Sequence, residues 1–258
     1  METGLEYARH GALGLAATHY QPPGDGPFPA VVMVHGGAWT SSNRGATADL
    51  CRMLCDAGVV VLAVDFRMPP VAVYPGAADD VRSAVRWLKE HAAQLHTLPA
   101  LVGVAGVSSG GQTALLCAVD AADGEEVAFA VGCWPISDPL ARYRMAHERG
   151  LANLIAAHEA YFGDEATMIA ASPQHIVVSG NARSLPPVLV VQGLADENVP
   201  PEMAPAFAAA YERAGGEIEL RLFPGESHAF IKAGAGGASA EATRFIIEFI
   251  RRQSVSVA

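Results

Sequence analysis

The sequence predicts an α/β protein built on a mostly parallel, doubly wound sheet. Short apolar runs without polar alternation recur along the chain, which is typical of strands buried on both faces of a parallel sheet. Segments of helical length separate these runs, and such alternation indicates strand-helix-strand units. The chain has 258 residues, of which 51% are hydrophobic, so it can bury a large core. We therefore expect one domain over residues 1–258.

The expected strands are apolar runs rich in valine and alanine. Five continuous runs occupy residues 31–34, 59–64, 101–105, 128–131 and 188–191. A further strand is expected over residues 218–223, near the end of the chain. Residues 15–20 are expected to add an antiparallel strand in front of the parallel series.

Helices are expected in the segments between these runs. The segments span residues 46–57, 77–91, 109–120, 201–214 and 240–252. In the second of them, Val81, Val85 and Leu88 are spaced as i, i+4 and i+7, which places them on one buried face of a helix.

Residues 136–184 break this alternation. The segment is too long for an ordinary connection in such a sheet, and it carries helical patterns of its own around residues 142–147 and 151–161. We expect a lid insertion over the functional site. The alternative is a surface excursion that packs on the edge of the sheet.

The charge balance limits the classes of partner. The formal net charge of −10 at pH 7 argues against a nucleic-acid binder, which needs clustered Lys and Arg to neutralise phosphates. Residues 1–10 carry charges and lack the apolar run of a signal peptide, and no stretch approaches the length that spans a bilayer. We therefore expect a cytoplasmic protein with a small-molecule substrate and no membrane insertion. A homodimer remains one option for its assembly.

The four cysteines, Cys51, Cys55, Cys117 and Cys133, all lie within apolar segments. Free cysteine commonly behaves as a small buried hydrophobe. Cys51 and Cys55 are four residues apart, but no second Cys/His pair at zinc-like spacing accompanies them. We expect these cysteines to pack in the core, and we expect no metal and no cofactor.

The pentapeptide Gly106-Val107-Ser108-Ser109-Gly110 has the G-x-S-x-G pattern of a nucleophilic serine. It follows a buried strand and opens a helix, which is the context that gives the motif meaning. A sharp turn between strand and helix leaves no room for side chains beside the serine, so glycine is needed on either side. The helix N-terminus also favours a developing anion. Ser108 is therefore the expected nucleophile.

A serine hydroxyl needs a histidine base that is oriented by a carboxylate. Asp196 follows the apolar run at 188–191, and His228 follows the expected strand at 218–223. Both therefore lie in loops past the carboxyl ends of strands, where open α/β sheets build their sites. The order Ser108, Asp196, His228 along the chain matches the order of one known class of catalytic triad.

Other residues compete for these roles less well. Glu197 and Glu226 are rival acids because they are near Asp196 and His228 in sequence, and Asp138 precedes Pro139 as a helix cap would. The remaining histidines lie in the insertion or away from strand ends: His10, His19, His91, His96, His147, His158 and His175.

The loop His35-Gly36-Gly37-Ala38-Trp39 follows the strand at 31–34 and can present backbone amides to an oxyanion. We expect the amides of Gly37, Ala38 and Ser109 to form the oxyanion hole, with a shift to Gly36 as an alternative. His35 is expected to be structural. Trp39 is expected either to line the acyl pocket or to fill the core. Tyr161, with Phe162 and Met168, is expected either to line a pocket or to anchor the insertion.

Together, the loop at 35–39, the tripeptide at 65–67, the elbow around Ser108 and the segments at 192–196 and 226–228 resemble the α/β-hydrolase esterases related to hormone-sensitive lipase and bacterial carboxylesterases. That group usually has three glycines after the histidine and a long N-terminal helical cap. This chain has Ala38 at the third position and enters its first strands almost at once. The resemblance therefore extends to small bacterial esterases and arylformamidases. It implies the α/β-hydrolase fold and a serine mechanism.

The expected function is a serine carboxylic-ester hydrolase that acts on small to medium acyl esters through an acyl-enzyme. Amide or formamide hydrolysis is the alternative within enzymes, because it uses the same catalytic groups. A ligand-binding protein without catalysis is the alternative from a different class.

Overall fold

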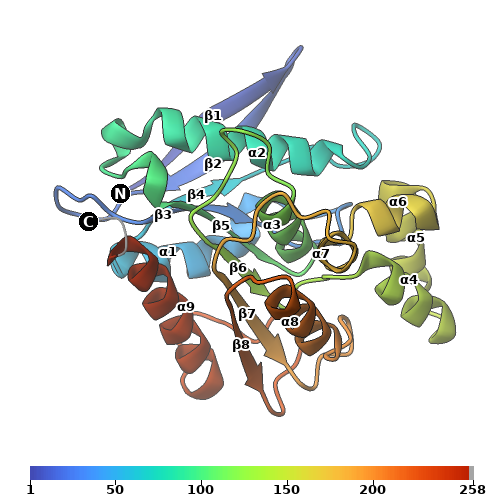
Figure 1. The fold of residues 1–258 in the computed structure, drawn as a ribbon. Helices are drawn as coiled ribbons and strands as arrows, with labels where there is room; N and C mark the ends of the chain where they lie inside the picture. Colours follow the sequence, from blue (N-terminus) through green and yellow to red (C-terminus); the bar gives the residue numbers. More distant parts are fainter. Residues whose placement is uncertain (256–258) are drawn as a thin grey trace.

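The computed structural model describes residues 1–255 and contains one eight-stranded sheet with helices on both faces (Figure 1). The strand order is β1-β2-β4-β3-β5-β6-β7-β8. The six strands from β4 onward in this order run parallel, whereas β1 pairs antiparallel with β2 and β2 pairs antiparallel with β4. The strands are β1 Glu2–His10, β2 Leu13–Tyr20, β3 Ala30–Val34, β4 Val60–Val64, β5 Val102–Val107, β6 Ala130–Cys133, β7 Val188–Gly193 and β8 Ile218–Phe223. The α/β-hydrolase fold, with its mostly parallel sheet, is confirmed.

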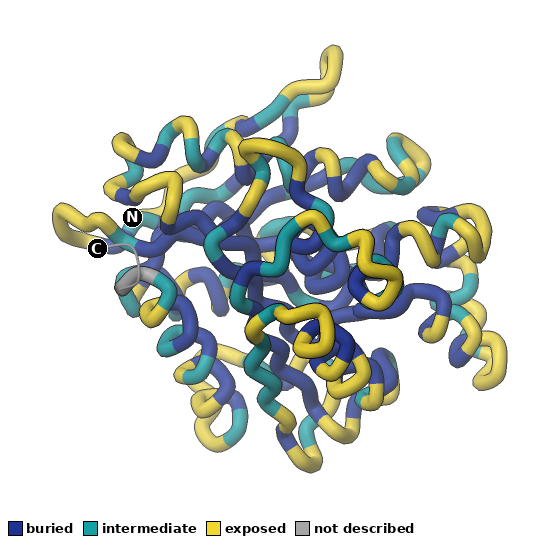
Figure 2. Tube along the Cα trace, in the orientation of Figure 1, coloured by how far each residue is buried: buried dark blue, intermediate teal, exposed yellow. Residues whose placement is uncertain are grey.

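The helices divide between the two faces of the sheet. Residues of α1 and α9 pack into one apolar cluster, and residues of α2, α3, α7 and α8 pack into the other. The α-helices are α1 Ala48–Asp56, α2 Gly76–Glu90, α3 Ser109–Val119, α4 Pro139–Glu148, α5 Ala152–Phe162, α6 Glu165–Ala170, α7 Pro173–Val178, α8 Met203–Arg213 and α9 Gly237–Val255. All five helices expected from the sequence are present. The buried residues gather along the central strands and on the inner sides of these helices (Figure 2).

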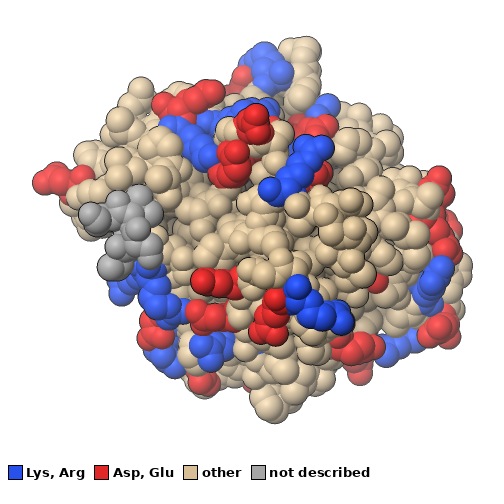
Figure 3. Space-filling view, viewed as in Figure 1, with Lys and Arg blue, Asp and Glu red and all other residues tan. Residues whose placement is uncertain are grey.

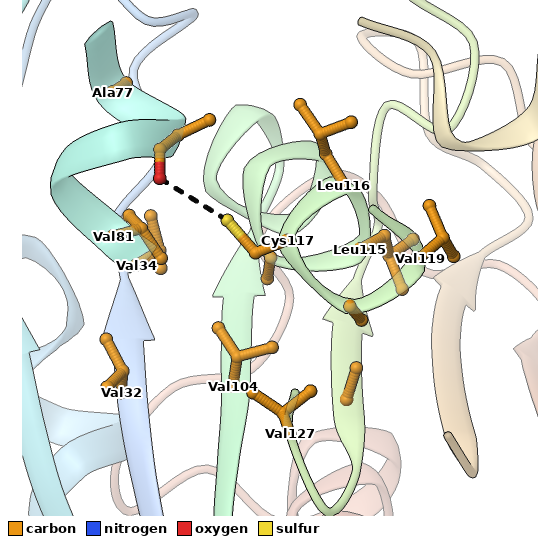
Figure 4. Close-up of a cluster of buried hydrophobic side chains, with 14 of the residues drawn as sticks. Val32, Val34, Ala77, Val81, Val104, Leu115, Leu116, Cys117, Val119 and Val127 are labelled. Carbon is orange, nitrogen blue, oxygen red and sulfur yellow. Dashed lines mark hydrogen bonds between the residues drawn. The ribbon is translucent and has the colours of Figure 1, made fainter. Parts of the chain in front are cut away.

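The core between α2, α3 and the sheet is almost entirely aliphatic. Valines of β3 and β5 belong to one cluster with Val81 of α2 and Leu115 of α3, and the close-up shows Val34 beside Val81 (Figure 4). Cys117 of α3 lies among them and donates its thiol to the carbonyl of Ala78, with 3.6 Å between sulfur and oxygen. All four cysteines are free and buried, as the sequence predicted. Burial raises the pKa of the thiols of Cys117 and Cys133 to about 12.

The strand β1 was not predicted from the sequence. It pairs with β2 at the edge of the sheet, and most of its side chains are exposed, with only Tyr7 buried. The charged side chains of Glu2, Glu6 and Arg9 hid this strand, because an exposed edge strand needs no apolar pattern. The antiparallel strand expected at residues 15–20 is present as β2.

The turn between β5 and α3 depends on two glycines. A Cβ atom at Gly106 would lie 2.1 Å from the carbonyl oxygen of Gly110. A Cβ atom at Gly110 would lie 2.3 Å from the carbonyl oxygens of both Val34 and His35. The backbone of the elbow therefore packs directly against the backbone at the end of β3, and no other side chain fits at these two positions.

The segment at 136–184 forms the four helices α4 to α7. The helices α4, α5 and α6 lie together beside the sheet, and α7 lies between α3 and α8 (Figure 1). Hydrogen bonds fasten it to the rest of the molecule: Gln112 of α3 donates to the carbonyl of Ala171, and Arg142 donates to the carbonyl of Asn198. The backbone N–H of Tyr74 also donates to the carbonyl of Tyr161. The insertion thus rests on α3, on the loop after β7 and on the segment before α2.

Aromatic side chains join the insertion to the loop after β3. Trp39 is fully buried, stacks on Tyr161 with 5.6 Å between ring centroids, and has its ring faced by the edges of His158 and Phe162. His158 is fully buried and donates from Nδ1–H to the carbonyl of Leu154. Burial is the main cause that lowers the pKa of His158 to about 4.

We expect the substitution Gly110→Ala to destabilise the fold by at least about 2 kcal/mol, because the added methyl group meets backbone atoms that cannot move independently. Gly4→Ala is the matched control, since no described residue beyond its chain neighbours comes within 4 Å of a Cβ atom placed there. Urea denaturation of both variants measures the difference. Equal stability of Gly110→Ala and Gly4→Ala would contradict the packing described above.

We expect His158→Phe to weaken the acid dependence of stability. The folded-state pKa of His158 is about 4, below its ordinary value of 6.5, so the unfolded chain binds more protons between these two values. The neutral ring of His158 makes its full contribution to the free energy of unfolding above about pH 6.5, and this contribution falls as the pH is lowered toward about 4. The free energy of unfolding, measured at about pH 5 and pH 7.5, should therefore change less in His158→Phe than in the wild type. His147→Phe, at an exposed position on α4, should leave the difference unchanged.

Candidate functional site

Ser108 stands at the turn between β5 and α3, at the carboxyl edge of the sheet. Its backbone has φ of 55° and ψ of −122°, a conformation that non-glycine residues rarely adopt. Hydrogen bonds from its N–H to the carbonyl of Cys133 and from Gln112 N–H to its carbonyl hold this turn. The residue is 8% exposed. Strain of this kind, held by the surrounding backbone, is common at functional sites.

Asp196 and His228 meet across the loops that follow β7 and β8. His228 Nδ1 lies 2.8 Å from Asp196 Oδ2. The backbone N–H groups of Asn198 and Val199 both donate to Asp196 Oδ1, and Gln192 Nε2 donates to Oδ2. Burial raises the pKa of Asp196, but the hydrogen bonds from His228 and the two amides outweigh it, and the net pKa is lowered. The carboxylate is thus charged and fully engaged in orienting the imidazole.

Ser108 and His228 line the same cavity, which has a volume of about 400 Å³. Among the described residues, Ser108 Oγ forms no hydrogen bond in this structure, and catalytic contacts of this kind often tighten only when substrate binds. Apolar side chains form much of the wall, with polar and charged ones beside them. The lining residues are Gly36, Gly37, Ser42, Ala46, Thr47, Asp49, Leu50, Val107, Ser108, Trp134, His228, Ala229, Ile231 and Lys232.

The loop after β3 presents backbone amides beside the elbow. Gly36 packs against it so closely that a Cβ atom would lie 3.1 Å from the carbonyl oxygen of Val107 and 3.2 Å from Ser108 Cβ. Within residues 1–255, the backbone N–H groups of Gly37, Ala38 and Ser109 donate no hydrogen bond, so they are available to an oxyanion. Gly37 has φ of 112° and Ala38 has φ of 50°. The side chain of Ser109 accepts from the N–H of Trp39 and so ties this loop to the elbow.

The structure does not bring Trp39 or Tyr161 to the cavity. Both rings are buried in the aromatic cluster with the insertion, and neither belongs to the lining. Trp39 Nε1 donates to Gln112 Oε1, which holds the ring in the core. The insertion likewise supplies none of the residues that line the cavity. A lid role for it therefore stays a prediction, and its contacts here are those of a support beside the site.

The rivals lie elsewhere. His35 is fully buried, stacks on Phe66 and contacts the carbonyl of Gly36 through Nδ1, so it braces the loop. Burial lowers the pKa of His35. Asp138 caps α4 by accepting from the N–H of Ala141, as the sequence indicated. His228 pairs with Asp196 rather than with Glu197 or Glu226.

Sequence reasoning missed three polar residues that support the site. Gln112 connects Trp39 to the insertion, Asn198 donates to Asp196, and Arg142 binds Asn198. Arg142 is 1% exposed, although arginine is rarely buried without a charged partner. No local motif marks these residues, because each acts through a contact with a distant segment. The position of Gln112, one helical turn after Ser108, was the only available signal.

Between Met1 and Val255, no three His, Cys, Asp or Glu side chains are grouped so as to hold a metal ion. No helix in that range is both long enough and apolar enough to cross a bilayer. On the face shown in Figure 3, basic side chains are interspersed with acidic ones rather than gathered together.

Comparison with known protein sequences gives clear relatives. A carboxylic ester hydrolase of Mycobacterium tuberculosis, LipN, is 32% identical over 256 residues, which cover 92% of this chain and 66% of LipN. An ethyl acetate hydrolase of Pseudomonas putida is 31% identical over 232 residues, which cover 84% of this chain and 71% of that protein. The chain thus spans about two thirds of the length of these relatives.

Solved structures give the same relationship. Esterase 2 of Thermogutta terrifontis, phosphorylated by paraoxon, superposes with a TM-score of 0.77 at 26% identity, over 96% of this chain and 94% of that one. The same esterase has also been solved with propionate or butyrate bound, at 25% identity. The sequence model of the alpha/beta hydrolase fold family matches residues 31–232. Because that match runs from β3 through the loop of His228, this chain belongs to the α/β-hydrolase fold family, and its relatives are carboxylic ester hydrolases.

Proposed function

We propose that this chain hydrolyses carboxylic esters of small to medium acyl groups through a covalent acyl-enzyme on Ser108. One observation carries the proposal: the imidazole of His228 is oriented by Asp196 at 2.8 Å and shares a cavity with Ser108. A serine hydroxyl becomes a nucleophile when such an oriented imidazole accepts its proton. The names of LipN and of the ethyl acetate hydrolase support the same reaction class.

The mechanism follows from the positions of these groups. His228 accepts the proton of Ser108 Oγ as the oxygen attacks the ester carbonyl, and Asp196 stabilises the resulting imidazolium. The amides of Gly37, Ala38 and Ser109 stabilise the oxyanion. His228 then gives its proton to the departing alcohol. Water, activated by the same imidazole, attacks the acyl-enzyme and releases the carboxylic acid.

We expect Ser108→Ala to lower kcat on p-nitrophenyl acetate by at least about 10³-fold, because the substitution removes the atom that forms the acyl-enzyme. Paraoxon should inactivate the wild type stoichiometrically, as a phosphorylated form is known for the Thermogutta esterase. Mass spectrometry should find the diethylphosphoryl group on the peptide that contains Ser108 and none on Ser108→Ala. Ser179→Ala, at the exposed residue that follows α7, should keep wild-type activity and labelling. Full turnover by Ser108→Ala would refute the proposed mechanism.

We expect short acyl chains to be preferred. The cavity of about 400 Å³ lies near the lower end of the range for ligand pockets, and both halves of the ester share it. For p-nitrophenyl esters, kcat/KM should be highest from acetate to butyrate and about tenfold or more lower for decanoate. The propionate and butyrate complexes of the Thermogutta esterase agree with this range.

The variant Ile231→Trp tests the size argument directly, because Ile231 lines the cavity. It should lower the ratio of kcat/KM for butyrate over acetate, since a larger side chain leaves less room for the longer acyl group. Val178→Trp, on the exposed surface of α7, is the control and should leave the ratio unchanged. A constant ratio in Ile231→Trp, or activity that rises through decanoate, would show that the cavity does not set the acyl length.

A further inference from the structure

We propose that Arg142, which comes from the insertion, is a positioning residue that holds the carboxylate of Asp196 in the orientation required by His228. The proposal rests on the triad of the proposed function. It assigns to the insertion a role in catalysis that needs no contact with substrate.

The geometry forms a continuous chain of contacts from α4 to the base. Arg142 Nε donates to the carbonyl oxygen of Asn198 at 3.0 Å, and Nη2 donates to Asn198 Oδ1 at 2.5 Å. The backbone N–H of Asn198 in turn donates to Asp196 Oδ1 at 2.8 Å. The other carboxylate oxygen of Asp196 lies 2.8 Å from His228 Nδ1. The guanidinium of Arg142 therefore binds both the main chain and the side chain of Asn198, whose own N–H donates to Asp196.

Two hydrogen bonds from Arg142 to Asn198 restrain the loop after β7 more than one hydrogen bond would. A fork that binds both the carbonyl and the side-chain oxygen of one residue fixes the orientation of that residue as well as its position. The orientation of Asn198 decides where its N–H points, and that N–H is one of two amides on Asp196 Oδ1. A shift of about 1 Å in such a supporting group is enough to cost about 100-fold in rate.

The charges of Arg142 and Asp196 also support a link between these two residues. Arg142 is buried, and among residues 1–255 it has no ion pair: its hydrogen-bond acceptors are both oxygens of Asn198. A buried cation requires a nearby negative charge. Burial lowers the pKa of Arg142 to about 10, while the negative charge of Asp196 acts in the opposite direction. Arg142 is thus cationic at neutral pH and provides a buried positive charge for the buried carboxylate of the triad.

Other features of Arg142 agree better with a positioning role at the site than with a role in packing alone. Within residues 1–255 its buried Nη1 has no hydrogen-bond partner, so part of its hydrogen-bonding capacity is left unused. A residue retained only for stability would be replaced with little loss by an apolar side chain of similar size. Arg144, two residues further along the same helix, is exposed and pairs with Glu165, and so offers a matched comparison.

The test is a double-mutant cycle between Arg142→Met and Asp196→Asn, with kcat and KM measured on p-nitrophenyl acetate. We expect Arg142→Met to lower kcat by about 10- to 100-fold with KM changed by less than about twofold. Asp196→Asn alone should cost about 10⁴-fold. In the Asp196→Asn background, Arg142→Met should cost less than about threefold more, because the acid that it positions no longer works. Arg144→Met should match the wild type.

Two further measurements separate positioning from loss of fold. Thermal unfolding of each variant shows whether the folded state persists at the assay temperature. The low-field proton resonance of His228 Nδ1–H reports the contact with Asp196, and it should weaken or disappear in Arg142→Met while remaining in Arg144→Met. If Arg142→Met does not fold, Asn198→Ala takes its place in the cycle, because it removes the side-chain acceptor and leaves the backbone carbonyl.

The outcomes are distinct. Wild-type kcat in Arg142→Met or Asn198→Ala, or an undiminished loss in the Asp196→Asn background, would overturn the positioning role. Wild-type activity of Asp196→Asn would instead refute the triad on which the proposed function depends. A loss of kcat that disappears in the Asp196→Asn background, with the folded state intact, would establish the role of Arg142.

Discussion

The site depends on backbone packed directly against backbone where β3 and β5 end. Gly106 lets the end of β5 approach the backbone of Gly110. Gly110 lets the turn around Ser108 touch the carbonyl groups at the end of β3, and Gly36 lets the following loop approach the same turn. These contacts exclude side chains, so Ser108, the proposed nucleophile, and the amides of Gly37 and Ala38 proposed for the oxyanion hole are brought together by the main chain alone. The strained backbone of Ser108 persists because it has neighbours on both sides. Every other group of the site is arranged around this contact.

A second level of support comes from buried polar side chains that cross between segments. Gln112 accepts from Trp39 and donates to the carbonyl of Ala171, so that one amide group joins the loop after β3 to the insertion. Gln192 donates to Asp196 in the same way from within β7. Such groups are costly to bury unless they are paired, and pairing restricts them to one arrangement. Hydrogen bonds therefore hold the insertion in a fixed position relative to the site at several points, although the insertion lines none of the cavity.

The sequence predicted those parts of the molecule that have a local signature. The continuous apolar runs identified the parallel strands, and the elbow identified Ser108 because glycine at fixed positions reflects a backbone constraint. Asp196 and His228 followed from their positions after two strands, and the structure brings these two side chains into contact. The strand β1 escaped detection because its one buried side chain, Tyr7, leaves no periodic pattern.

The roles of Trp39 and Arg142 could not be predicted from the sequence for a different reason. Trp39 could belong to a pocket or to the core, and only the stacking with Tyr161 and the hydrogen bond to Gln112 decides for the core. Arg142 reads as an ordinary helical residue until Asn198, which lies 56 positions away, is seen against it. Contacts between distant segments have no signature in either segment alone, so supporting residues of this kind are found only in three dimensions.

The rim of the cavity has a practical consequence for handling the protein. The sequence contains two lysines, Lys89 and Lys232, beside fifteen arginines. Lys89 binds the carbonyls of Gly124 and Glu126, whereas Lys232 is exposed and lines the cavity of Ser108. Amine-directed crosslinkers and resins would therefore attach at Lys232 as well as at the exposed N-terminal amine of Met1, and attachment at Lys232 would obstruct the cavity of Ser108. Coupling through surface carboxylates would carry a similar risk, because Asp49 is exposed and lines the same cavity.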